Sequence, residues 1–287
     1  MNENKNLRRD SKFMKLAACV KMLRINNWLG YFLIATLGYA IFTRGSAGIS
    51  ETLYFYALVC LYLGFSFSIN NTFDVKEDSL KGKKSNPVAA GEIDQKEGVL
   101  LSLFLALLGM LLSLTRSPGA FLFYAILIFL SFSYSAPPFR LKSRPFLDLA
   151  SHGLFFGSLL FLFPSAFFSK DIEVLHAIIA ISVFHLSVIF ELRNHMEDYE
   201  TDKKAGVTTI ACALGLRACE RFTRFLSFLF PLSLLPVFYA INTGALFSLF
   251  LATTSIFYLA FYSKKSYRIL DIYSNLSYFL ILLGVLL

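Results

Sequence analysis

Apolar residues in this chain occur in long, nearly uninterrupted runs with almost no polar stripe. A helix that crosses a bilayer needs roughly 20 mostly apolar residues. Nine runs approach or reach that length, and they cover residues 26–43, 53–72, 98–115, 119–137, 146–168, 173–193, 224–241, 244–262 and 269–287. A surface helix of a soluble bundle would show a polar face instead. The pattern predicts an all-α polytopic membrane protein with nine transmembrane helices in a single domain, residues 1–287.

Charged residues gather between these runs and predict the topology. They make up 16% of the chain, against about a quarter in a soluble domain. All but three of the 27 Lys and Arg lie in segment 1–24, in the loops after even-numbered runs, or directly beside them; the exceptions are Arg44, Arg116 and Lys170. Lys and Arg accumulate on the cytoplasmic side, so the N-terminus and those loops are predicted to be cytoplasmic.

The net charge of +8 fits this topological bias, together with attraction to anionic membrane lipid. Nucleic-acid binding is not indicated, because the basic residues are spread over separate loops rather than gathered in one patch. No Cys-x-x-Cys pair occurs among the four cysteines, so the sequence indicates neither a structural zinc site nor a redox motif.

Two polar segments with the same spacing follow the second and sixth runs. The first carries Asn70, Asp74, Asp78 and Gly82, and the second carries Asn194, Asp198, Asp202 and Gly206. Residues four apart share one helix face, and carboxylates at that spacing repel each other unless a cation lies between them. Mg²⁺ prefers oxygen ligands and usually binds through a few carboxylates together with substrate phosphates.

The matched segments therefore predict one Mg²⁺ site, with Asp74, Asp78, Asp198 and Asp202 as its ligands, at the cytoplasmic ends of two helices. The recurrence is also compatible with an internal duplication. The alternative is a solvated, mixed-charge loop, because lysines adjoin both segments.

Basic residues on the same predicted face are candidates for binding a diphosphate. Pro137 and Pro138 end the fourth run, and Arg140 and Lys142 follow at once. Guanidinium groups suit phosphate oxygens, and ammonium groups serve as point charges. Arg24, beside the first run, is a further candidate. The alternative for all three cations is ordinary flanking charge.

Polar residues inside the apolar runs usually face a cavity or a partner helix. Asp148 and Glu191 are compatible with either role, and His152 lies near Asp148 in the same run. For His185 we expect a hydrogen-bonded contact between helices.

At these residues the chain resembles the UbiA-type intramembrane prenyltransferase superfamily. Asn70, Asp74 and Asp78 resemble its first aspartate-rich motif, and Asp198, Asp202 and Gly206 resemble its second. Asn86-Pro87 with Gly91, and Tyr134-Ser-Ala-Pro-Pro138 with Arg140 and Lys142, resemble two further signatures, so the resemblance covers nearly the whole chain.

The resemblance implies nine transmembrane helices around a central cavity with cytoplasmic caps. It implies Mg²⁺ held by both acid motifs, with Asp74, Asp198, Arg140 and Lys142 in catalysis. The other residues implied to bind substrate are Asn70, Asn86, Tyr134, Arg24, Glu191 and Asn194. Two departures stand out: Asn86 is followed directly by Pro87, where many members have an intervening Arg, and Glu191 and Asn194 replace the Asp and Tyr of some aromatic-acceptor members. The second departure disfavours a quinone-type acceptor, and the run Asp198–Gly206 is closer to archaeal and carotenoid-elongating members.

The predicted function is Mg²⁺-dependent transfer of a prenyl group from a prenyl diphosphate to a lipophilic acceptor in the cell membrane, with release of pyrophosphate. Two alternatives also use acids in a membrane protein. A CDP-alcohol-type phosphotransferase would carry an Asp-Gly-x-x-Ala-Arg signature, which the sequence lacks. A divalent-cation transporter would place its acids near the bilayer midplane rather than at helix ends.

The topology is testable by accessibility. In a chain without its four native cysteines, a cysteine at Ala47 should react with an impermeant thiol reagent applied to intact cells, and one at Ser85 should react only after lysis. Labelling of Ser85 from outside would overturn the predicted orientation.

Overall fold

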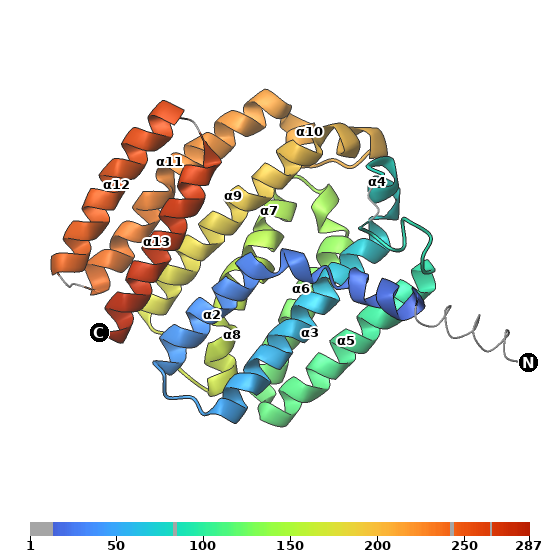
Figure 1. Cartoon of the computed structure of the whole chain (residues 1–287), viewed down its shortest axis with the longest axis horizontal. Helices are drawn as coiled ribbons and strands as arrows, with labels where there is room; N and C mark the ends of the chain where they lie inside the picture. Colours follow the sequence, from blue (N-terminus) through green and yellow to red (C-terminus); the bar gives the residue numbers. More distant parts are fainter. Residues whose placement is uncertain (1–13, 83–84, 242–243, 265) are drawn as a thin grey trace, which may run out of the picture.

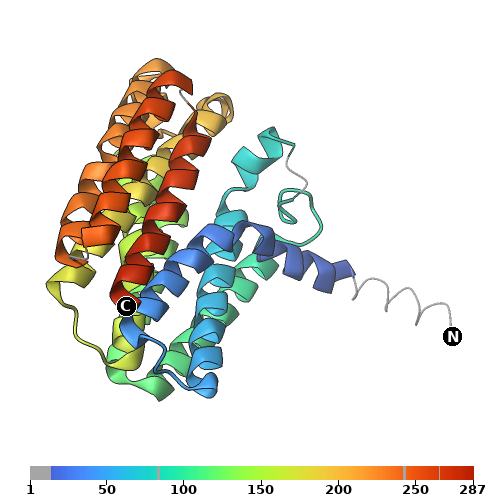
Figure 2. The same ribbon diagram turned by 60° about the vertical axis from the view of Figure 1, so that its left-hand side comes forward.

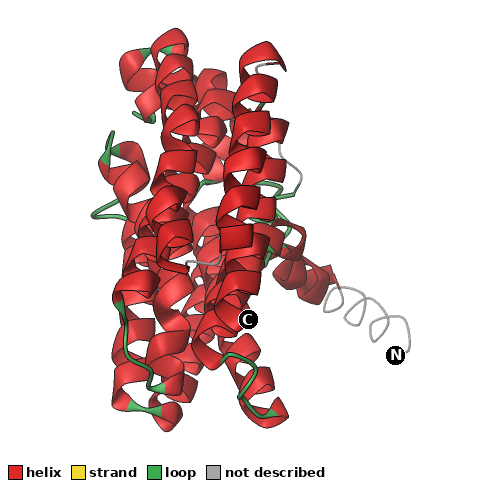
Figure 3. Cartoon of the chain, turned by 90° about the vertical axis from the view of Figure 1, so that its left-hand side faces the viewer, coloured by secondary structure: helices red, strands yellow, loops and turns green. Residues whose placement is uncertain are grey.

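A computed structural model describes residues 14–82, 85–241, 244–264 and 266–287. All regular elements in this part of the chain are helices (Figure 3). Eight of its helices are long and apolar enough to cross a membrane, and a ninth span results if the bent pair near the N-terminus is counted. The predicted all-α, polytopic class is therefore confirmed. Residues 1–13 of the basic segment 1–24 lie outside the described residues, and residues 14–22 are helical.

The spans follow the predicted runs closely. They are α3 (Ile49–Phe73), α5 (Gln95–Arg116), α6 (Pro118–Ser135), the combined α7 (Leu147–His152), η3 (Gly153–Ser158) and α8 (Leu159–Phe168), α9 (Val174–Ala205), α11 (Leu216–Ile241), α12 (Gly244–Lys264) and α13 (Tyr267–Leu286). The largest difference is in α9, which continues well past residue 193 and carries the second acid motif within an unbroken helix.

The first predicted span is bent. Residues 14–27 meet α2 (Leu29–Thr43) at 65°. With 15 residues, α2 is about 22 Å long, shorter than a hydrocarbon core of about 30 Å. The short 3₁₀ turn η1 (Ile25–Asn27) stands at the bend, directly after Arg24, which has a left-handed backbone (φ 48°). The bend leaves Arg24 beside the polar end of the bundle instead of within a straight span.

Short elements gather at one end of the bundle. Figure 1 shows α4 (Val75–Leu80) and α10 (Ile210–Leu214) at the same end, near the end of α9. The 3₁₀ turn η2 (Leu141–Ser143) follows α6, which ends at Ser135 ahead of the two prolines as predicted. Lys76 of α4 donates a hydrogen bond to the carbonyl of Ala205 (2.6 Å), so α4 is attached to the last turn of α9.

Two buried apolar clusters hold the bundle together. One joins α2 and α8 to α9, α11, α12 and α13, and the other joins α2 to α3, α5, α6 and the η3–α8 segment. Ala35 of α2 belongs to the second cluster, whereas Leu37 and Ile41 belong to the first. Figure 2 shows α2 between the two groups of helices. An internal duplication is not confirmed, because the two acid motifs occupy unlike surroundings: one at a helix break and one within a continuous helix.

The contact between α2 and α8 depends on Gly38. A Cβ atom there would lie 2.0 Å from the carbonyl oxygen of Phe161. This distance is far below van der Waals contact, so the backbones of α2 and α8 would have to move apart. Gly30, on the same helix, has open space around it. Glycine at residue 38 thus permits the close approach of α2 to α8.

Gly38→Ala should therefore destabilise the protein in detergent by about 1–3 kcal/mol, because it overpacks this contact. Gly30→Ala is the matched control and should leave the thermal midpoint unchanged or slightly raised. Equal midpoints for the two variants would show that the α2–α8 contact is not close-packed.

Candidate active site

A cavity of about 400 Å³ opens at the end of the bundle where α4 and α10 lie. Both acid motifs reach its wall, which includes Asn70, Asp74, Asp78, Asn194, Asp198 and Asp202. Farther in, the wall becomes aromatic, with Tyr31, Phe67, Phe155 and Phe156. The cavity thus joins a carboxylate-rich mouth to an aromatic interior.

The first acid motif lies at a break between two helices. The predicted continuous helix face is wrong in this detail, because α3 ends at Phe73 and α4 begins at Val75, with Asp74 as the linking residue (φ −97°, ψ 18°). Backbone hydrogen bonds of 2.9 Å from Asp74 to Asn70 and from Asp78 to Asp74 preserve the four-residue register across the break. The three polar side chains consequently still line one cavity.

Asn86 supports this motif from behind. It is fully buried and donates hydrogen bonds to the Asn71 carbonyl (2.9 Å) and to Asp78 Oδ2 (2.8 Å). The predicted substrate-binding residue therefore orients a predicted metal ligand, and it is not part of the cavity wall formed by the described residues.

Lys142 places its ammonium group on the first motif. It forms an ion pair with Asp74 and lies 3.5 Å from Glu77 Oε1. Burial raises the pKa of Asp74 even though Lys142 opposes this change. At Glu77 burial acts in the same direction, but Lys142 and Arg140 together lower its pKa below the usual value.

Arg140 lies one layer away from the cavity. Its Nη2 pairs with Glu77, and its Nη1 donates to the Phe73 carbonyl (3.3 Å). Its left-handed backbone (φ 41°) directs the chain into η2. Arg140 thereby holds the α3–α4 junction, and its expected contact with a diphosphate remains a prediction.

The second motif faces the first across the cavity. Asp198 forms a 2.6 Å ion pair with Lys81, which extends from the end of α4. Asp202 is buried one turn further along α9, and Gly206 ends that helix in a left-handed conformation (φ 77°). The first aspartate of each motif, Asp74 or Asp198, is therefore paired with a lysine from another segment of the chain.

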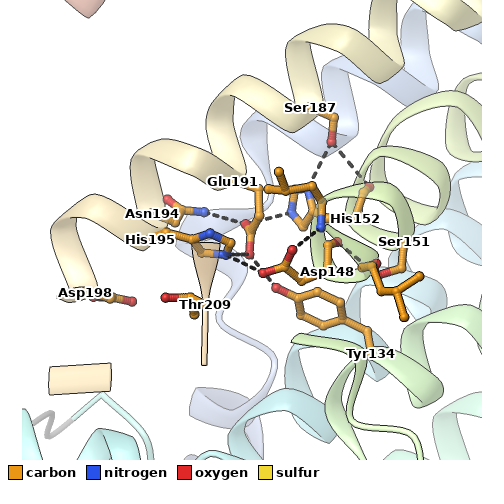
Figure 4. Close-up of polar contacts among 12 residues, drawn as sticks. Tyr134, Asp148, Ser151, His152, Ser187, Glu191, Asn194, His195, Asp198 and Thr209 are labelled. Atoms are coloured by element: carbon orange, nitrogen blue, oxygen red, sulfur yellow. Dashed lines mark hydrogen bonds and ion pairs between the residues drawn. The ribbon is translucent and has the colours of Figure 1, made fainter. Parts of the chain in front are cut away.

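Four further predicted residues adjoin the same cavity. Arg24 lies on its wall, with its guanidinium 5.3 Å from the centre of the Phe67 ring. Figure 4 shows Tyr134 and Asn194 pointing toward Glu191, which accepts a hydrogen bond from each. His185 instead contacts the Leu226 carbonyl (3.0 Å), which agrees with the predicted helix contact.

Sequence reasoning did not single out Glu77, Lys81 or His195 as site residues. Glu77 and Lys81 look like ordinary charges beside a motif, and only the fold brings them to Arg140, Lys142 and Asp198. His195 had one available signal, its position four residues after Glu191 on a helix.

The donor chemistry of the site suits a hard divalent cation. Carboxylate oxygens from both motifs face one cavity, and Asp74 is largely buried there beside Lys142. Among the described residues, no three acidic, His or Cys side chains are close enough together to hold an ion by themselves. Phosphate oxygens would therefore have to complete the coordination, which is how Mg²⁺ is commonly held.

The fold and the cavity define an integral membrane protein with a carboxylate- and lysine-lined site at one end of its helical bundle. A family model for the UbiA prenyltransferase family matches residues 31–282, so the chain belongs to this family. The predicted family and enzyme class, a membrane prenyltransferase, are confirmed.

Individual relatives agree with this assignment. The chain is 28% identical over 239 residues to digeranylgeranylglyceryl phosphate synthase of Saccharolobus solfataricus, covering 80% of each chain. It is 31% identical over 155 residues to lycopene elongase/hydratase of Haloferax volcanii, covering 53% of this chain and 49% of the relative. A UbiA homologue of Archaeoglobus fulgidus, solved with GPP and Mg²⁺, has the same fold, with a TM-score of 0.74 at 23% identity over 93% of this chain and 98% of the other.

Lys142 is the basic residue of η2 and lines the cavity, so its removal should weaken diphosphate binding. Removing one charge-assisted contact costs about 1.5–3 kcal/mol, which is roughly a 10- to 150-fold loss of affinity. Calorimetry with pyrophosphate and Mg²⁺ should detect this loss in Lys142→Met. The exposed neighbour provides the control, Arg144→Met, which should bind normally. Equal affinity in the two variants would leave Lys142 as a structural partner of Asp74 alone.

Proposed function

We propose that the protein transfers a prenyl group from a prenyl diphosphate to a lipophilic acceptor inside the membrane and releases pyrophosphate. The observation that carries the proposal is the meeting of both acid motifs and Lys142 on one cavity whose interior is aromatic. Such a cavity suits a ligand with an anionic head and an unsaturated hydrocarbon tail. Membership of the UbiA prenyltransferase family and the names of the relatives support the same reaction.

Asp74, Asp78, Asp198 and Asp202 would hold Mg²⁺ together with the diphosphate. When bound, the cation neutralises the diphosphate and stabilises pyrophosphate as the leaving group. Lys142 and Lys81 then become available to phosphate oxygens, because each is already at the cavity mouth, paired with the first aspartate of a motif. Arg24 offers a third positive charge on the same wall.

The remaining residues of the cavity prepare the hydrocarbon end of the donor. Aromatic faces attract positive charge, so Tyr31, Phe67 and Phe156 favour the allylic carbon as it becomes cationic. Their rings are packed together: Tyr31 stacks on Phe156 at 4.1 Å between centroids. A packed aromatic wall also excludes water, which would otherwise capture the allylic carbon.

The proposed orientation places this site at the cytoplasmic face. Its support is the distribution of Lys and Arg along the sequence, because the loops rich in these residues end at the cavity mouth. Soluble prenyl diphosphates would then enter from the cytoplasm and acceptors from the bilayer. The phosphotransferase and cation-transporter alternatives are not favoured, since neither uses an aromatic interior below a diphosphate site.

The two motifs should act as one unit. Asp74→Asn and Asp198→Asn each keep the size of the side chain and remove a charge that Mg²⁺ requires. Each should reduce transfer by at least 100-fold, and the double variant should be hardly worse than either single variant, as expected of groups that serve one step. Radiolabelled prenyl transfer in membranes at saturating Mg²⁺ measures all three.

Protein amount and thermal midpoint should remain near those of the wild type, which separates loss of chemistry from loss of fold. Normal turnover of either single variant, or losses that multiply in the double variant, would contradict a shared site.

A further inference from the structure

A second polar cluster lies along the cavity, apart from the aspartates of the two acid motifs. It consists of Tyr134, Asp148, His152, Glu191 and His195, drawn in Figure 4. Asp148 comes from α7, His152 from the end of that helix, and Glu191 and His195 from α9. All four of these residues are at least 94% buried, yet His152, Glu191 and His195 contribute to the cavity wall, as does Tyr134.

Glu191 is the centre of this cluster. Its Oε1 accepts from Tyr134 and lies 3.3 Å from His195 Nε2, while its Oε2 accepts from Asn194 (3.0 Å) and lies 3.3 Å from His152 Nε2. The neighbours of His152 assign its proton to Nε2, because that nitrogen faces the Glu191 carboxylate. Its Nδ1 is then an acceptor and lies 3.0 Å from the Ser187 hydroxyl, which can donate to it.

His195 stands between two carboxylates. Its Nε2 is 3.3 Å from Glu191 Oε1 and 3.2 Å from Asp148 Oδ2, so the proton on Nε2 has two acceptors. Asp148 Oδ2 is completely buried and receives no well-aligned hydrogen bond from the described residues. An unsatisfied buried carboxylate oxygen is costly, which makes Asp148 a ready alternative acceptor for the His195 N–H.

The approach of α9 to this cluster requires a small residue on the neighbouring span. A Cβ atom on Gly153, in the π-helical turn η3, would lie 2.6 Å from the Phe184 ring. Single-turn π-helices occur frequently at functional sites. Here the turn begins directly after His152 and contains Phe155 and Phe156, which line the cavity.

We propose that Glu191 accepts the proton of an acceptor hydroxyl group, and that His195 and Asp148 position it for this step; the inference rests on the proposed prenyl transfer. The allylic C–O bond breaks and its electron pair leaves with pyrophosphate. The hydroxyl oxygen forms the new C–O bond, giving an ether, and its proton passes to the Glu191 carboxylate. The His195 N–H then donates to Asp148 alone. Glu191 thus loses one hydrogen-bond donor as it gains the proton, and the buried Asp148 Oδ2 gains one.

A hydroxyl acceptor fits this cluster better than a hydrocarbon does. A hydroxyl group donates one hydrogen bond to a carboxylate and presents its lone pairs to the donor carbon at the same time. A polyene would instead place an apolar surface against four buried polar side chains, which is unfavourable. The acceptor class is therefore a membrane alcohol whose hydroxyl reaches the inner end of the cavity.

Glu191→Gln tests the assignment, because glutamine keeps the shape and cannot take the proton. Purified protein in liposomes would be given geranylgeranyl diphosphate, Mg²⁺ and one of three acceptors: a hexadecyl ether of glycerol phosphate with a free hydroxyl, a hexadecyl phenol, or lycopene. We expect the wild type to form the ether product with the alcohol. Glu191→Gln should lower its rate by roughly 10²- to 10⁴-fold, the usual contribution of a general base.

A merely structural role for Glu191 would reduce transfer to both hydroxyl acceptors equally. A proton-accepting role predicts a defect at least tenfold smaller with the phenol, whose proton leaves more readily. Asp148→Asn should show a smaller defect with the same dependence on acceptor acidity, and Glu191→Asp should recover part of the rate. Glu220→Gln is the matched control, since Glu220 pairs with Arg224 at the surface and is absent from the cavity wall formed by the described residues.

Binding of pyrophosphate with Mg²⁺ reports separately on the diphosphate site and should be unchanged in Glu191→Gln. Equal rates for Glu191→Gln and the wild type, equal defects with alcohol and phenol, or wild-type transfer to lycopene alone would each overturn the inference while leaving prenyl transfer intact. A wild type that binds no pyrophosphate and alkylates no acceptor would instead overturn the proposed function itself.

Discussion

The constraint on which the site depends is the need to balance several carboxylates inside a membrane protein. A buried carboxylate is unstable as an anion unless a cation or hydrogen-bond donors compensate its charge. The chain meets this need with lysines from distant segments: Lys142 on Asp74 and Lys81 on Asp198. The same pairing brings η2 to the α3–α4 junction and the end of α4 to α9. Charge balance therefore determines how the polar end of the bundle is assembled, besides preparing it for a metal–diphosphate ligand.

The inner cluster solves the same problem by other means. Glu191 is compensated by neutral donors and two histidines instead of by lysine. A lysine there would hold the carboxylate permanently as an ion pair, whereas hydrogen bonds can be exchanged between neighbouring acceptors. The cavity thus has carboxylates of two kinds. Asp74 and Asp198 at the mouth are held in ion pairs with lysines, whereas the hydrogen-bond donors around Glu191 can move to a neighbouring acceptor.

Much of this could be predicted from the sequence, because both the membrane and the metal impose regular patterns. Apolar runs marked each span, although α9 and α11 extend beyond the predicted runs, and the four-residue spacing picked out Asp74, Asp78, Asp198 and Asp202, which line one cavity. The helix break at Asp74 was not predictable, since the i, i+4 register survives it. The role of Asn86 behind Asp78, and the pairing of Arg140 with Glu77, depend on side chains brought together by the fold. His195 was missed although it lies four residues after Glu191, because its second carboxylate partner, Asp148, comes from a distant segment that only the fold brings near.

The position of α2 between the two apolar clusters has a consequence for biogenesis. This helix shares one buried apolar cluster with α3, α5 and α6, and another with α13, which follows it much later in the chain. As the chain enters the membrane sequentially, the part of α2 that α13 covers must contact lipid or other helices until α13 has been inserted. The contact between α2 and α13 therefore forms late, although α2 itself is inserted early.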